Sequence, residues 1–187
     1  MQAKNNKILK EVSRSFYLSC QLSPKKIRDT IGLAFLFCKI ADTIADTELL
    51  PLKKRLESLN QYRQIFLQQQ SGHLIDEWKK NLFELLPDNN KLASAGEYDL
   101  LTNAASLFRE LKNLSPQDQD NICWLLPELT QGMQTDLIFF ANHANELRAL
   151  PDNEALEKYT YDVAGCVGIF WTRVLKQHYN FAKQWPK

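Results

Sequence analysis

The chain contains 187 residues, a length that fits one domain around one hydrophobic core. Apolar residues make up 44% of it and charged residues 24%, and these ordinary globular shares exclude wholesale disorder, collagen-like repeats and a small disulfide-stapled scaffold. The 23 lysines and arginines nearly balance the 22 aspartates and glutamates, leaving a formal charge of +1. This balance argues against binding to nucleic acid through a general positive field, so no nucleic-acid partner is predicted.

The N-terminal segment and the cysteines indicate a cytoplasmic protein. Residues 1–10 contain lysines but are not followed by the apolar stretch that a secretory signal requires. The longest apolar runs, residues 31–38 and 163–171, fall short of the roughly 20 residues that span a bilayer, which leaves peripheral membrane contact open. No C-x-x-C pair occurs among Cys20, Cys38, Cys123 and Cys166, so reduced, buried thiols are predicted rather than zinc or redox chemistry.

The chain has few helix-breaking residues, 6 glycines and 7 prolines, and this composition predicts an all-α fold. Ser23 and Pro24 are typical of an N-cap and a first helical position, and helical spacing of apolar residues from Ile27 predicts a long buried helix over residues 25–47. Further helices are predicted over residues 52–69, 74–86, 98–111, 117–149 and 153–183. In the last, Gly165 and Gly168 predict a kink or a close approach to the backbone. The elements form one predicted domain over residues 1–187.

Two aspartates in the first of these helices carry the clearest chemical signal. Asp42 and Asp46 are four residues apart, which places both carboxylates on one helix face, one turn from each other. Their mutual repulsion would be removed by a cation, and Mg²⁺ suits the pair because it takes one or two protein carboxylates and fills its other positions with water and phosphate oxygens. The alternative is that Lys39 neutralises a solvated helix end and the acids have no further role.

Four segments, in this order, carry a resemblance to a known family. They are S-R-S-F-Y over residues 13–17, D-T-I-A-D over 42–46, G-M-x-x-D-L over 132–137 and Y-T-Y-D-V-A-G-C-V-G over 159–168. The set resembles the squalene/phytoene synthase family, the head-to-head prenyl diphosphate synthases. The resemblance extends from about Val12 to Leu175 and implies an isoprenoid synthase-type helical bundle.

The resemblance assigns roles around a diphosphate. Asp42 and Asp46 match the first aspartate-rich motif, which holds Mg²⁺ against the substrate diphosphate and makes both residues catalytic and metal-binding candidates. The segment that contacts a diphosphate and closes over the cavity mouth matches Ser13, Arg14, Ser15 and Phe16. Helix capping and surface charge are the alternative roles of that segment.

The resemblance also implies a cavity for the prenyl chain. Tyr159 matches a tyrosine that faces the reaction cavity, where it could steady a carbocation or assist ionisation, and core packing is its alternative role. Val163, Gly165 and their small neighbours leave space for a prenyl chain or for a neighbouring helix. Six aromatic residues could line the channel or form the core: Phe35, Phe37, Phe139, Phe140, Phe170 and Trp171.

The implied activity is farnesyl-diphosphate farnesyltransferase-like. Two farnesyl or geranylgeranyl diphosphates would condense head to head, with Mg²⁺, through a cyclopropyl diphosphate intermediate. The C-x-G-x-F-W-T version over residues 166–172 slightly favours a squalene-forming member, which would also take NADPH.

Two departures from the family pattern qualify these expectations. Lys39 stands where many members have arginine, so a bidentate phosphate contact would become a point-charge contact. The second acidic motif should follow the helix at 153–183, but the sequence stops at residue 187. We therefore expect a C-terminally incomplete bundle: a truncated form, a shortened gene product, or a subunit completed by another chain. Uncovered apolar faces would favour self-association.

That departure keeps two other interpretations open. One is a catalytically inactive helical module that binds a prenyl diphosphate or a partner subunit. The other is purely structural, in which Asp42 and Asp46 serve no ligand and their removal only relieves repulsion.

Overall fold

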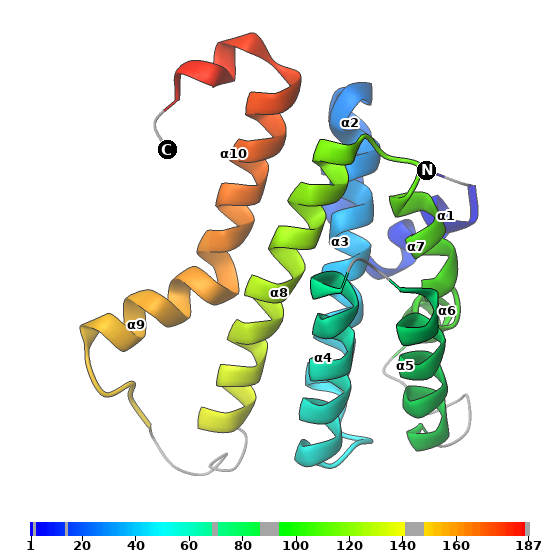
Figure 1. Cartoon of the computed structure of the whole chain (residues 1–187), viewed down its shortest axis with the longest axis vertical. Helices are drawn as coiled ribbons and strands as arrows, with labels where there is room; N and C mark the ends of the chain where they lie inside the picture. Colours follow the sequence, from blue (N-terminus) through cyan, green and yellow to red (C-terminus); the bar gives the residue numbers. More distant parts are fainter. Residues whose placement is uncertain (2, 14, 69–70, 87–93, 141–147, 186–187) are drawn as a thin grey trace.

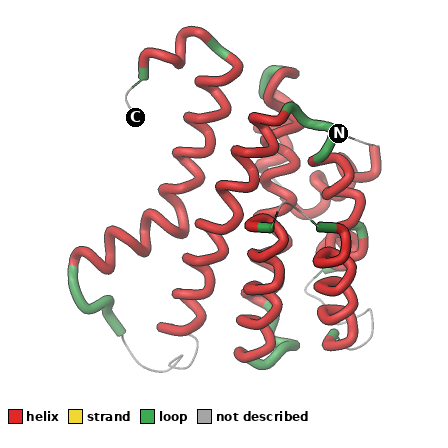
Figure 2. Tube along the Cα trace, viewed as in Figure 1, coloured by secondary structure: helices red, strands yellow, loops and turns green. Residues whose placement is uncertain are grey.

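The computed structural model describes residues 1, 3–13, 15–68, 71–86, 94–140 and 148–185. This part of the chain is helical and contains no strand, as Figure 2 shows, which confirms the predicted all-α class. Arg14 falls outside the described residues, so the site expectation placed on it stays a prediction. The elements in chain order are α1 (Ala3–Ser13), α2 (Ser15–Leu22), α3 (Lys25–Asp46), α4 (Leu52–Leu67), α5 (Gly72–Leu85), α6 (Ala95–Thr102), α7 (Ala104–Leu111), α8 (Pro116–Phe139), α9 (Asn153–Thr160), a π-helix η2 (Tyr161–Gly165), α10 (Cys166–His178) and a 3₁₀ helix η3 (Asn180–Gln184).

Helix α8 holds the other helices together. It packs against α3 and α4 on one side and against α10 and the π-helix on the other (Figure 1). Its start follows from the sequence: the Ser115 hydroxyl accepts a hydrogen bond from the Asp118 N–H, and Pro116 occupies the first turn, where no N–H is needed. Leu125, Leu126 and the residues one turn on are buried, so the contacts of α8 are mostly apolar.

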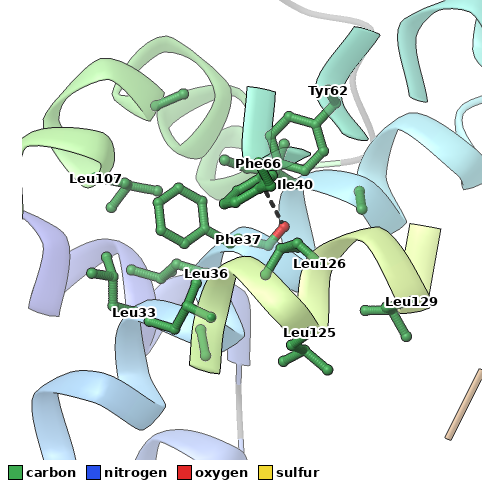
Figure 3. Packing of buried hydrophobic residues seen from close by; sticks show 14 of the residues in the cluster. Leu33, Leu36, Phe37, Ile40, Tyr62, Phe66, Leu107, Leu125, Leu126 and Leu129 are labelled. Carbon is green, nitrogen blue, oxygen red and sulfur yellow. Dashed lines mark hydrogen bonds between the residues drawn. The ribbon is translucent and has the colours of Figure 1, made fainter. Parts of the chain in front are cut away.

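Helix α3 runs through the centre of the core and confirms the predicted helix over 25–47 to within a residue. The ring of Phe37 is fully buried and lies 5.2 Å from Phe66 and 4.9 Å from Phe108, measured between ring centroids. The buried hydroxyl of Tyr62 on α4 donates to the Phe37 carbonyl over 3.0 Å, so its polar atom does not stay unpaired (Figure 3). Aromatic packing here joins α3, α4 and α7.

Two predicted helices differ in extent from those in the structure. The helix predicted over 98–111 is broken into α6 and α7 at Asn103, whose buried side-chain amide donates to the side-chain oxygen of Asn5 on α1. Sequence periodicity could not show this break because its cause is a contact with a distant helix. The helix predicted over 117–149 ends at Phe139, and residues 141–147 of that prediction lie outside the described residues. Helices α1 (Ala3–Ser13) and α2 (Ser15–Leu22) fall where no element was predicted.

The predicted helix over 153–183 is divided into four consecutive elements. Asp152 caps α9 by accepting from the Ala155 N–H over 2.8 Å, and the chain then passes through the π-helix into α10. Figure 1 shows a bend between α9 and α10 in this region, where the glycines predicted an irregularity. The close approach itself occurs at Gly132 of α8, where a Cβ atom would lie 2.9 Å from the Asp162 backbone. Gly168 instead faces open space.

Among the described helices, none combines the length and the apolar character required to cross a membrane.

Replacing Phe37 with alanine should strongly destabilise the fold, because it removes a ring that connects three helices and leaves a cavity. We expect a loss of about 3–5 kcal/mol in the free energy of unfolding, measured by chemical denaturation. The control is Leu67→Ala, since that side chain is 50% exposed and its removal should change stability by less than about 0.5 kcal/mol. Equal effects of the two substitutions would contradict the described core.

Candidate functional site

A cavity of about 440 Å³ opens where α1, α2, α3 and α8 meet. Half of the residues that line it are polar and half are apolar, a composition suited to a ligand with a charged head and a hydrocarbon tail. Four predicted substrate-binding residues, Ser13, Ser15, Phe35 and Lys39, line it together with Asp42. The remaining lining residues are Val12, Cys38 and Met133.

Asp42 and Asp46 lie in the last turns of α3, and only Asp42 is part of the cavity wall. The Asp42 side chain is 41% exposed and accepts a hydrogen bond from Lys39 Nζ over 2.6 Å. Asp46 is exposed at the end of the helix. Lys39 therefore neutralises Asp42, as the structural alternative predicted, but it does so inside a cavity rather than on an open helix end.

Lys39 is shared between two carboxylates. Its Nζ lies 2.6 Å from Asp42 Oδ2 and 3.0 Å from Glu97 Oε1 in the first turn of α6. Burial lowers the pKa of Lys39, but the hydrogen bonds to both acids outweigh it and raise the pKa overall, so the ammonium stays charged. Glu97 Oε2 is buried and accepts no hydrogen bond from the described residues. Sequence reasoning missed Glu97, and no motif around it could have indicated this role.

Burial and repulsion raise the pKa of Asp46. After burial, the largest contribution is the charge of Asp42, and Asp136 and Glu97 add to it, whereas Lys39 partly offsets them. Four carboxylates, those of Asp42, Asp46, Glu97 and Asp136, thus influence one another. The Lys39 ammonium contacts two of them, Asp42 and Glu97. This excess of negative charge fits a divalent cation, since Mg²⁺ needs only one or two protein carboxylates when phosphate oxygens supply other ligands. The described residues contain no group of three or more metal-binding side chains.

Ser13 and Ser15 of the segment 13–16 line the cavity. The Ser13 hydroxyl is buried and donates back to the Leu9 carbonyl in α1, so its hydrogen is not available to a phosphate. Ser15 is exposed at the start of α2. Phe16 stacks on Phe35 with ring centroids 4.5 Å apart. Of the two serines, only Ser15 has its hydroxyl free of this bond within α1, and Phe35 adds an apolar ring to the cavity lining.

Tyr159 lies outside the residues that line the cavity but is connected to the acidic region. Its hydroxyl donates to Asp136 Oδ1 on α8 over 2.6 Å. This hydrogen bond, burial and the charge of Asp136 raise the pKa of Tyr159 to about 12, so the phenol is neutral at physiological pH. Asp136 belongs to the G-M-x-x-D-L segment, which was the available signal for it, but its contact with Tyr159 could not be read from the sequence.

The small-residue segment contributes to helix packing. Val163 lies against Gly132, where a Cβ atom would come within 3.0 Å of its Cγ1. Gly165 is exposed, and a Cβ atom there would meet the Tyr161 ring of the same segment at 3.3 Å. Neither residue lines the cavity at α3, so contact of Val163 and Gly165 with a prenyl chain stays a prediction.

The four cysteines are free, and two of them, Cys20 and Cys166, are fully buried. Burial raises the pKa of the thiols of Cys20, Cys123 and Cys166 to about 11 and raises that of Cys38 further. Protonated thiols are poor nucleophiles and poor metal ligands. The predicted reduced thiols are thus present, but Cys38 and Cys123 are only partly buried.

Comparison with solved structures defines the class of fold. The chain superposes on TcSQS in its complex with the ligand E5700 with a TM-score of 0.68 at 21% identity, covering 92% of this chain and 43% of that one. The complex of TcSQS with BPH1237 gives the same values. The fold is therefore that of the all-α isoprenoid synthases.

Sequence comparison then gives the family. The family profile of squalene/phytoene synthase matches residues 9–185, so the chain belongs to the squalene/phytoene synthase family, whose members are prenyltransferase-type enzymes. The bifunctional lycopene cyclase/phytoene synthase of Blakeslea trispora is 28% identical over 172 residues, covering 90% of this chain and 24% of that protein. For the squalene synthase of Schizosaccharomyces pombe, the identity is 27%, over 91% of this chain and 33% of that protein. The chain thus spans less than half the length of these relatives.

The two aspartates should respond differently to neutralisation. Asp46→Asn removes a repelled carboxylate and should raise the free energy of unfolding at pH 7 by about 0.3 kcal/mol, whereas Asp42→Asn breaks an ion pair and should give no gain. Because the pKa of Asp46 is raised in the folded state, the penalty is fully present above that pKa and disappears as the pH falls below the unfolded value. Denaturation of both variants at pH 7 and under acidic conditions tests this, and a gain from Asp42→Asn would contradict it.

Proposed function

We propose that this chain binds a prenyl diphosphate with Mg²⁺ at the cavity beside α3, as part of a head-to-head prenyltransferase of the squalene/phytoene synthase family. The single observation that carries the proposal is that Asp42 of the D-x-x-x-D pair and the aromatic ring of Phe35 line the same cavity. The two chemical characters match the head and the tail of the ligand. Family membership supports the same substrate class.

The polar residues of the cavity lining would hold the diphosphate. Asp42 and Asp46 would hold Mg²⁺, which when bound neutralises the charge that develops on the leaving diphosphate. Lys39 offers its ammonium as a point charge to a phosphate oxygen at the cavity wall. To do so it would exchange the Asp42 contact for phosphate while Glu97 keeps it in place. The Ser15 hydroxyl can donate one further hydrogen bond to the anion.

The apolar residues of the cavity lining would hold the hydrocarbon tail. Phe35 lines the cavity and is stacked on Phe16, so it offers an apolar ring to a bound tail, and exclusion of water by that contact would protect an allylic cation from hydrolysis. The ring faces can also stabilise such a cation. Condensation of two farnesyl or geranylgeranyl diphosphates follows from this chemistry as the proposed reaction. The product, with or without the use of NADPH, stays a prediction from the motifs.

Removing either aspartate should abolish the Mg²⁺-dependent part of ligand binding. We expect Asp42→Ala and Asp46→Ala to weaken binding of farnesyl thiodiphosphate, a poorly ionising analogue, by at least about tenfold in the presence of Mg²⁺. Calorimetric titration with and without Mg²⁺ measures this. The matched control is Asp76→Ala, an exposed aspartate on α5 away from the cavity. Binding that needs no Mg²⁺ and is unchanged in both variants would refute the proposal.

A second candidate function is a binding module without turnover. It is favoured by the absence of any group of three metal-binding side chains among the described residues, since one acidic pair supplies few ligands. Mg²⁺-dependent release of pyrophosphate from farnesyl diphosphate separates the two candidates. Binding of the analogue together with no release of pyrophosphate supports the module, whereas release that is lost in Asp42→Ala supports the enzyme.

A further inference from the structure

The contact between α8 and the segment after α9 is unusually close. At Gly132 a Cβ atom would lie 2.9 Å from both the carbonyl carbon and the Cβ of Asp162, a distance that side chains do not tolerate. Asp162 is buried, and its carboxylate accepts a hydrogen bond from Lys158 over 2.7 Å. The backbone of α8 therefore rests against a buried residue whose carboxylate is paired within its own segment.

Tyr159 is held by the same face of α8. Asp136 follows Gly132 by four residues and Phe140 follows Asp136 by four, so the three positions lie above one another along the helix. Gly132 permits the close approach, Asp136 accepts the Tyr159 hydroxyl over 2.6 Å, and Phe140 meets the Tyr159 ring edge-on at 6.0 Å between centroids. Hydrogen bond and ring contact together fix both the position and the tilt of the phenol.

Asp136 also acts on the acid pair. Its negative charge contributes to the raised pKa of Asp46, so the field of Asp136 reaches from α8 to the end of α3. The hydrogen bond to Asp136 places the Tyr159 hydroxyl beside this acidic region. The direction of the hydrogen bond matters chemically, because a phenol that donates to a carboxylate has its lone pairs, not its hydrogen, left for a ligand.

We propose that Asp136 is a positioning residue: by accepting the Tyr159 hydrogen it fixes the phenol against α8, so that Tyr159 has only its oxygen lone pairs, and no acidic hydrogen, to offer to a ligand that reaches it. The catalytic meaning of this arrangement rests on the function proposed above. The positioning itself rests on Gly132, Asp136 and Phe140 and can be tested without any turnover.

The first test measures the Tyr159 phenol directly. Protein labelled with 3-fluorotyrosine, which ionises at lower pH than tyrosine, is titrated by ¹⁹F NMR, and the Tyr159 signal is assigned by its loss in Tyr159→Phe. We expect this signal to titrate above that of the exposed Tyr161, and Asp136→Asn to lower its midpoint by at least about one pH unit. The control Asp120→Asn, an exposed aspartate on the same helix, should leave the midpoint unchanged.

Two further variants separate positioning from simple charge. Asp136→Glu keeps the charge and should retain a raised midpoint. Gly132→Ala keeps Asp136 but pushes the Tyr159 segment away from α8, and should lower the midpoint as Asp136→Asn does. An unchanged Tyr159 midpoint in a folded Asp136→Asn variant would overturn the proposal.

Kinetics then test the role in the reaction. Where the wild-type chain releases pyrophosphate from farnesyl diphosphate, Asp136→Asn and Tyr159→Phe should each reduce kcat about tenfold or more with little change in KM, and the double variant should lose no more than the larger single loss. Losses that multiply in the double variant would overturn the proposal. A wild-type chain that neither binds nor turns over its substrate would refute the proposed function, and the NMR titration would still decide whether Asp136 positions Tyr159.

Discussion

Close packing of α8 against its neighbours is the constraint on which the rest of the structure depends. On one side, apolar residues of α8 are buried with those of α3 and α4, and on the other side α8 meets α10 and the π-helix. Burial of apolar area supplies the free energy of these contacts, but Gly132 sets how near the backbones come. The helix that carries the acid pair and the helix that carries Tyr159 are thus placed relative to each other through α8.

The electrostatics of the site follow from this arrangement. Helices α3, α6 and α8 each bring carboxylates into one region, and Lys39 pairs with two of them while Asp46 keeps a raised pKa. An ion-pair network that served only to stabilise the fold would not need this excess of carboxylates over ammonium groups. A folded protein keeps repelling charges together at a cost in stability, and a bound cation with a diphosphate would relieve that cost.

The apolar part of the cavity has a different physical origin. Phe35 on α3 lines the cavity, and α2, which follows α1 and packs against α3, brings the ring of Phe16 onto it. Ser13 meanwhile uses its hydroxyl hydrogen within α1. Within residues 13–16, therefore, Ser13 bonds inside α1 and Phe16 packs on Phe35. The resemblance had assigned both Ser13 and Phe16 to the ligand.

The sequence by itself determined the helical class, the approximate extent of α3, α4 and α5, the family, and the placement of Asp42 and Asp46 on one helix face. These features depend on residue spacing within a helix, which is local and repeats every 3.6 residues. The tertiary structure alone decided the break at Asn103, the closeness of α8 at Gly132, the pairing of Lys39 with Glu97 and the bond from Tyr159 to Asp136. Each of these joins residues from different helices, and no local pattern encodes which distant side chain will complete a contact.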